Sequence, residues 1–214
     1  MILFYIGLFF TSFFVAFSGA VMPGPLLTAT ISEAARKGFK AGPLFIIGHS
    51  ILELVLLVLL VLGFSAFITN EWITFTISIF GSLIMLWMAL DMFRSLPRLS
   101  LQNPEAAKQK KNLIFTGAIV SLANPYWTIW WATIGLGYIL QSQKKGFLGI
   151  GLFYFGHILG DFVWYSFIAF VVSSGKKFFN DMKYRILIAA CAGLLIFFAI
   201  LFIWNGLKFL VKFI

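Results

Sequence analysis

Long apolar runs, separated by short polar connectors, dominate the chain from one end to the other. Six runs can be traced, at residues 2–31, 43–64, 72–93, 113–140, 147–172 and 186–211. Each is near or above the roughly 20 apolar residues that a helix needs to cross a membrane. The runs are unbroken, whereas the strands of a membrane β-barrel alternate apolar and polar residues. The pattern therefore predicts an all-α integral membrane protein, with six transmembrane helices in one domain that covers residues 1–214.

The composition excludes a soluble globular protein. Of the 214 residues, 61% are hydrophobic and only 11% are charged, and the mean hydropathy is +1.00. The net charge of +9 would suggest a nucleic-acid partner in a soluble domain, but here the basic residues lie between the apolar runs. In that position they act as topology signals and contact anionic lipids. We therefore expect membrane lipids, and no nucleic acid, as partners.

The basic residues also predict the orientation of the chain. If the N-terminus lies outside the cytoplasm, twelve Lys and Arg residues fall in inside connectors and four fall outside. The inside set is Arg36, Lys37, Lys40, Arg94, Arg98, Lys108, Lys110, Lys111, Lys176, Lys177, Lys183 and Arg185. Because cytoplasmic loops carry the excess of positive charge, we expect both termini outside the cytoplasm and a cytoplasmic linker at residues 94–112.

An internal repeat is the most informative feature of the sequence. Without any gap, residues 36–53 align with residues 144–161, and the aligned positions share a basic pair followed by Gly-Phe, a Leu-Phe pair, a Gly-His pair and an acid. Each half, 1–93 and 113–214, contains three predicted spans, so the two copies cross the membrane in opposite senses. The sequence therefore predicts an inverted repeat, a construction in which many secondary transporters bind substrate near the membrane midplane.

Proline interrupts the first run of each half. Pro23, Gly24 and Pro25 lie in the first run, and Asn124 and Pro125 lie in the fourth. Because proline removes an N–H group and clashes with the preceding turn, both helices should break there. A packed kink is one explanation. A symmetry-related pair of breaks favours a binding site, in which the N-terminus of the restarted helix meets an anion such as a substrate carboxylate.

Two histidine–acid pairs lie within predicted spans. His49 and Glu53 are four residues apart, as are His157 and Asp161, so each pair shares one helix face. An acid within the hydrocarbon is costly unless it is paired or hydrated. We therefore expect a relay for protons or cations, in which the acids exchange protons or accept a substrate ammonium group and the histidines pass protons or orient the acids. The alternative is that each histidine only satisfies its own acid.

Several conspicuous residues are better explained by packing than by binding. Trp127, Trp130 and Trp131 are interpreted as packing or lipid-contacting groups rather than as a cage for a cation. Gly48 and Gly156 are interpreted as positions where helices approach closely.

One set of residues, spread over most of the chain, follows the pattern of a known family. The set is Pro23, Gly24, Pro25, Gly38, Gly42, Gly48, Glu53, Asn124 and Pro125. It resembles the LysE-type (LysE/RhtB) exporters, which implies a plasma-membrane secondary carrier that exports amino acids and is driven by an ion gradient. The chain departs from the family pattern at Leu52, where a small residue is common, and at Tyr126, where a lysine is common. Tyr126 lies beside the second break and joins the candidate substrate-binding residues.

Three functions stay open at this point. The favoured one is a secondary active transporter that exports amino acids or similar zwitterionic or cationic solutes with a proton or sodium gradient, with a homodimer left open. The second is a divalent metal cation carrier, because histidines and acids suit zinc or manganese, although no spacing requires a metal. The third is an intramembrane hydrolase with Glu53 and Asp161 as a proton-sharing dyad, against which the mixed acid types and the proline breaks argue. Neither a nucleotide-binding Gly-x-x-x-x-Gly-Lys-Ser/Thr loop nor a His-Glu-x-x-His motif occurs, so we expect no cofactor and no enzyme.

Overall fold

The regular structure of the chain is helical. The computed structural model describes residues 2–22, 24–65, 70–98, 112–175 and 180–211, and within these ranges there is no β-strand. The prediction of an all-α protein is therefore confirmed. Several residues used in the sequence predictions lie outside the described ranges, namely Pro23, the linker residues 99–111 with Lys108, Lys110 and Lys111, and the basic residues Lys176 and Lys177.

The elements follow one another in two groups, before and after the linker. The first group is α1 (Ile2–Ala20), α2 (Pro25–Lys37), α3 (Ala41–Val61) and α5 (Glu71–Ser95), with a short 3-10 turn at Leu96–Arg98. The second group is α6 (Leu113–Leu122), α7 (Pro125–Trp130), a π-helical turn (Trp131–Gly135), α8 (Leu136–Gln143), α9 (Gly146–Gly175) and α10 (Asp181–Val211).

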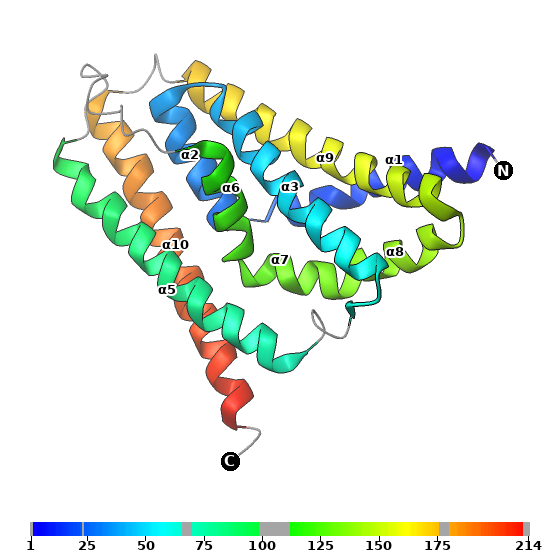
Figure 1. The fold of residues 1–214 in the computed structure, drawn as a ribbon. Helices are drawn as coiled ribbons and strands as arrows, with labels where there is room; N and C mark the ends of the chain where they lie inside the picture. The colour runs from blue at the N-terminus through cyan, green and yellow to red at the C-terminus, as the bar shows by residue number, and fades with distance from the viewer. Residues whose placement is uncertain (1, 23, 66–69, 99–111, 176–179, 212–214) are drawn as a thin grey trace.

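Five helices among the described residues are long and apolar enough to cross a membrane, namely α1, α3, α5, α9 and α10. The fourth apolar run is divided instead, because α6 has only ten residues and the chain restarts as α7 at Pro125. Figure 1 shows α7 and α8 leaving α6 at a steep angle. Large apolar side chains on the long helices, such as Phe14, Phe80 and Phe155, are more than 60% exposed, which suits contact with lipid.

Both helix breaks occur where proline predicts them. α1 ends at Ala20 and α2 begins at Pro25, after Gly24 in an extended conformation with φ −157° and ψ −173°. α6 ends at Leu122 and α7 begins at Pro125, after Asn124, whose side-chain oxygen accepts a hydrogen bond from the backbone N–H of Tyr126 at 3.1 Å. Proline suits the first turn of a helix. Backbone N–H groups in that turn have no carbonyl partner within the helix, so a residue without an N–H group loses no hydrogen bond there.

Long helices pack side by side and bring the two groups of elements together. α1 lies along α9, α3 lies against α6 and α9, and α5 lies along α10, a pair that is clear in Figure 1. A Cβ atom added at Gly48 would collide with the carbonyl oxygen of Ile114 in α6, and one added at Gly156 would lie 2.5 Å from the carbonyl oxygen of Phe9 in α1. The interpretation of both glycines as close-packing positions is therefore confirmed.

Candidate functional site

The two histidine–acid pairs meet at the contact between α3 and α9. His49 and Glu53 lie on the face of α3 that is turned toward α9, and His157 and Asp161 lie on the facing side of α9. All four side chains are buried, with Glu53 only 1% exposed. Their convergence follows from the i, i+4 spacing, which puts both members of each pair on one helix face.

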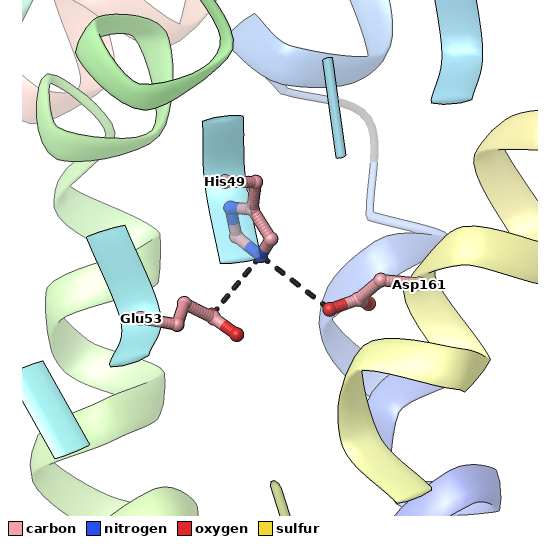
Figure 2. Close-up of side chains that lie close together, drawn as sticks. All are labelled: His49, Glu53 and Asp161. Carbon is pink, nitrogen blue, oxygen red and sulfur yellow. Dashed lines mark ion pairs between the residues drawn. The ribbon is translucent and has the colours of Figure 1, made fainter. Parts of the chain in front are cut away.

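Each imidazole faces both carboxylates. Nε2 of His49 lies 3.0 Å from Oε1 of Glu53 and 3.4 Å from Oδ2 of Asp161, as Figure 2 shows. Nε2 of His157 lies 3.2 Å from Oε2 of Glu53 and 3.4 Å from Oδ2 of Asp161. The four groups thus form one connected cluster rather than two separate pairs, so a proton added to or removed from one group acts on all four.

Two tryptophans complete the surroundings of Glu53. The indole N–H groups of Trp127 and Trp131 donate to Oε1 of Glu53 at 2.9 and 2.8 Å. The interpretation of these residues as packing groups misses this polar role. The signal that could have revealed it is their i, i+4 spacing just after Pro125, because a buried indole N–H needs an acceptor.

The two histidines have different environments at their second ring nitrogen. Nδ1 of His49 lies 2.8 Å from the hydroxyl oxygen of Ser121, near the end of α6. Nδ1 of His157 has no hydrogen-bond partner among the residues that the structure describes. The ring of Trp130 lies over His157 with its centroid 4.6 Å away, and its indole N–H donates to the hydroxyl of Ser18 at 3.0 Å. The neighbours of both histidine rings, Ser121 and Trp130, therefore come from the second half of the chain.

A cavity of about 150 Å³ joins the cluster to both helix breaks. Its wall includes His49, Glu53, His157 and Asp161 together with the predicted break residues Gly24, Pro25, Asn124 and Tyr126. Of the other two residues predicted for the substrate site, Pro125 is buried but is not among the described residues that line the cavity, and Pro23 lies outside the described residues. The cavity thus brings the four buried titratable side chains together with residues of both helix breaks.

Three residues of the cluster also have the geometry to hold a cation. One donor atom each of His49, Glu53 and Asp161 lies within 4.8 Å of the other two. Imidazole nitrogen and carboxylate oxygen are ligands that suit zinc and manganese.

The chain matches the family model for the LysE type translocator over residues 17–206. It belongs to the LysE family. The matched region contains both helix breaks and all four members of the histidine–acid cluster. The resemblance stated from the sequence motifs is therefore confirmed, and the family is one of translocators rather than of enzymes.

Two relatives are similar to this LysE-family chain along almost their whole length. The "Chemotactic transduction protein ChpE" of Pseudomonas aeruginosa is 22% identical over 193 residues, which cover 89% of this chain and 95% of the relative. The "Putative amino acid efflux protein YcgF" of Bacillus subtilis is 20% identical over 188 residues, which cover 86% of this chain and 90% of the relative. No solved structure matches the chain.

Proposed function

We propose that this LysE-family protein is a secondary carrier that exports amino acids, or similar small zwitterions or cations, across the plasma membrane with the energy of an ion gradient. The observation that carries the proposal is the cavity in which two buried histidine–acid pairs meet the ends of two broken helices. Buried ionisable groups and discontinuous helices are the features from which transporters build substrate and ion sites. The name of the relative YcgF, which refers to amino acid efflux, supports the same substrate class.

The proposed architecture is an inverted repeat of two three-span halves, 1–93 and 113–214, in which the fourth span is the broken segment from α6 to α8. Equivalent contacts in the two halves support it. Gly48 of α3 packs on a carbonyl group of α6, the first helix of the other half, and Gly156 of α9 packs on a carbonyl group of α1. Gly38 and Gly146, which the repeat aligns, both have positive φ angles, of 84° and 65°.

The proposed topology places both termini outside the cytoplasm and residues 94–112 inside. Arg36, Lys37 and Lys40 then lie on the cytoplasmic side, and Lys144 and Lys145 lie outside. The count of twelve basic residues inside against four outside supports this orientation.

The substrate carboxylate binds, in this proposal, at the N-terminus of α2. Gly24 caps this 13-residue helix without a side-chain hydrogen bond, so its first N–H groups lack a side-chain partner. Such groups, together with the helix dipole, attract an anion. Gly24 and Pro25 line the same cavity as the buried acids, so the carboxylate and the amino group of a zwitterion have candidate partners in one cavity.

The coupling ion in this proposal is the proton, with sodium as the competing candidate. Imidazole is the side chain that most readily gains and loses a proton near neutral pH. Nε2 of His49 lies 3.0 Å and Nε2 of His157 lies 3.2 Å from an oxygen of Glu53, distances at which an N–H group can donate to a carboxylate. Hard cations such as sodium prefer to be surrounded by oxygen ligands, whereas two nitrogens occupy this cluster.

The test is flux into proteoliposomes under an imposed proton or sodium gradient, with a panel of labelled amino acids. We expect the Glu53→Gln and Asp161→Asn variants to lose gradient-driven flux while they stay folded. The matched control is Glu71→Gln, which neutralises an exposed acid at the start of α5, far along the chain from the cluster. Full gradient-driven flux in both cluster variants would contradict the mechanism, and dependence on sodium alone would replace the proton.

A divalent-cation carrier is the second candidate, because His49, Glu53 and Asp161 already bring three suitable donor atoms together. Direct binding of zinc or manganese to the purified protein tests it. Binding that disappears in His49→Ala, combined with no flux of any amino acid, would favour this candidate over the first.

A further inference from the structure

The two acids of the cluster differ in how firmly they are held. Oε1 of Glu53 accepts hydrogen bonds from Trp127 at 2.9 Å and from Trp131 at 2.8 Å, and also lies 3.0 Å from one imidazole nitrogen. The other oxygen of Glu53, Oε2, has no hydrogen-bond partner among the described residues, so the two acids differ in the donors that reach Oε1. Oδ2 of Asp161 lies 3.4 Å from each imidazole and has no hydrogen-bond partner within the described part of the chain. Because Asp161 is only 3% exposed, its carboxylate is buried with acceptor capacity to spare.

The sequence after each helix break accounts for the difference in hydrogen-bond donors between Glu53 and Asp161. The two tryptophans stand two and six residues past Pro125, whereas the positions two and six residues past Pro25 are Leu27 and Ile31. Leucine and isoleucine carry no side-chain donor. The first half of the chain therefore cannot give Asp161 the pair of N–H groups that the second half gives Glu53.

Besides the acids and histidines, the cavity wall includes the polar residues Ser121, Asn124 and Tyr126 and a group of apolar side chains. The apolar side chains come from the start of α2 and from the middle of α10, and they are Leu26, Leu27, Phe198, Leu201 and Phe202. Among the described residues that line the cavity, Glu53 and Asp161 are the only acids and there is no lysine or arginine. The oxygens of Glu53 already lie within 3.2 Å of two indole nitrogens and two imidazole nitrogens, so a second cationic group on a ligand would have to compete with them or lie against the apolar side chains, where an unpaired charge is strongly disfavoured.

We propose that Asp161 binds the amino group of a neutral amino acid with an apolar side chain, and that Glu53 is a positioning residue, a fixed charge that orients both histidines. This assignment rests on the proposed transport function and adds the substrate class to it. An ammonium group that leaves water needs a carboxylate with free acceptor sites, and Asp161 offers one. The apolar wall from α2 and α10 then receives the side chain of the substrate.

The test is equilibrium binding of labelled leucine to the purified protein, with three competitors. These are 4-methylpentanoate, which is leucine without its amino group, 3-methylbutylamine, which is leucine without its carboxylate, and lysine. In the wild type we expect leucine to bind at least about tenfold more tightly than 4-methylpentanoate, because a charged hydrogen bond is lost. We expect lysine to compete at least about tenfold more weakly than leucine.

The decisive comparison uses variants of the two acids. In Asp161→Asn we expect leucine to bind about as weakly as 4-methylpentanoate, while the affinity for 4-methylpentanoate itself stays within about twofold of wild type. Asp161→Glu, which keeps the charge, should restore part of the preference for leucine. In Glu53→Gln we expect the preference for the amino group to remain, even though gradient-driven flux is lost.

The other outcomes contradict the assignment, the substrate class or the transport function. A preference for leucine that persists in Asp161→Asn, or that disappears in Glu53→Gln instead, would place the amino group on the other acid. If Asp161→Asn does not fold, equal binding of leucine and 4-methylpentanoate to the wild type would overturn it as well. Wild-type protein that transports only basic amino acids would refute the apolar substrate class alone, whereas wild-type protein that binds and moves no amino acid would refute the proposed transport function.

Discussion

The indole N–H of Trp131 lies 2.8 Å from a carboxylate oxygen of Glu53, and this contact ties the segment after the second helix break to α3. Trp131 is fully buried and begins the π-helical turn between α7 and α8. π-helical turns are rare and often occur at functional sites. If the α7–α8 segment moves, either this hydrogen bond to the buried acid breaks or Glu53 and α3 move with the segment.

Replacement of Trp131 by phenylalanine tests the strength of this link. Trp131→Phe removes one of the hydrogen bonds to Oε1 of Glu53, and a hydrogen bond to a charged group contributes about 1.5–3 kcal/mol. We expect a loss of that size in the free energy of unfolding, measured by thermal or denaturant unfolding in detergent, and a several-fold loss of gradient-driven flux.

The matched control for this variant is Trp164→Phe. The indole nitrogen of Trp164 in α9 is buried and has no hydrogen-bond partner among the described residues, so this variant removes the same atoms without removing a hydrogen bond. Equal losses of stability in the two variants would show that the indole N–H of Trp131 contributes nothing beyond packing.

Much of the candidate site could be predicted from the sequence, because it depends on spacing alone. The i, i+4 interval fixes which residues of α3 and α9 share a face, and the repeat predicts that the two faces meet. The hydrogen bonds of Trp127 and Trp131 depend instead on the direction that the chain takes after Pro125. Spacing does not determine that direction, because a broken helix can restart at many angles.

The fourth apolar run shows that the same limit of prediction from sequence applies to the fold. The break at Pro125 follows from the absence of an N–H group, and its place in the chain was predictable. The sharp turn of α7 away from α6, visible in Figure 1, is set by tertiary contacts such as that of Trp127 with Glu53. The hydropathy pattern therefore predicts an apolar run of spanning length at this place, but it does not predict the direction in which the chain turns within that run.

Alanine at Gly48 should destabilise the protein, because the added Cβ would collide with the carbonyl oxygen of Ile114. Backbone must shift to make room, and overpacking of this kind costs about 1–3 kcal/mol. Gly151→Ala is the control, since nothing lies within 4 Å of a Cβ atom there and alanine favours the helix. We expect unfolding measurements to show a loss for Gly48→Ala and none for Gly151→Ala. Equal stabilities would mean that α3 and α6 do not pack as closely as described.

An asparagine at Gly24 should block the proposed carboxylate site without harming the fold. Gly24 is extended rather than left-handed, and an added Cβ would meet its nearest neighbour, the side-chain nitrogen of Asn124, at an ordinary 3.7 Å. Asparagine is a strong helix N-cap, so its side chain would take the N–H groups of α2 that we assign to the substrate. We expect Gly24→Asn to weaken amino acid binding at least about tenfold with an unchanged or raised melting temperature.

The control for that prediction is Gly24→Ala, which adds the Cβ atom but no hydrogen-bond acceptor. We expect it to bind amino acids within a few-fold of wild type. If Gly24→Ala and Gly24→Asn weaken binding equally, the effect is steric and the N-terminus of α2 does not hold the carboxylate.

Single cysteines at Lys40 and Lys144 test the inverted arrangement of the two halves. Both lysines are exposed, and each lies in the connector that precedes its long helix, Lys40 just before α3 and Lys144 just before α9. In a background of Cys191→Ser, which removes the buried native thiol, we expect a membrane-impermeant maleimide to label Lys144→Cys in intact cells. Lys40→Cys should react only after the membrane is opened, because the proposed topology places Lys40 on the cytoplasmic side with the larger set of basic residues. Labelling of both cysteines from the same side would mean that the halves are parallel, and α3 and α9 could then not present their acids to the cavity from opposite sides of the membrane.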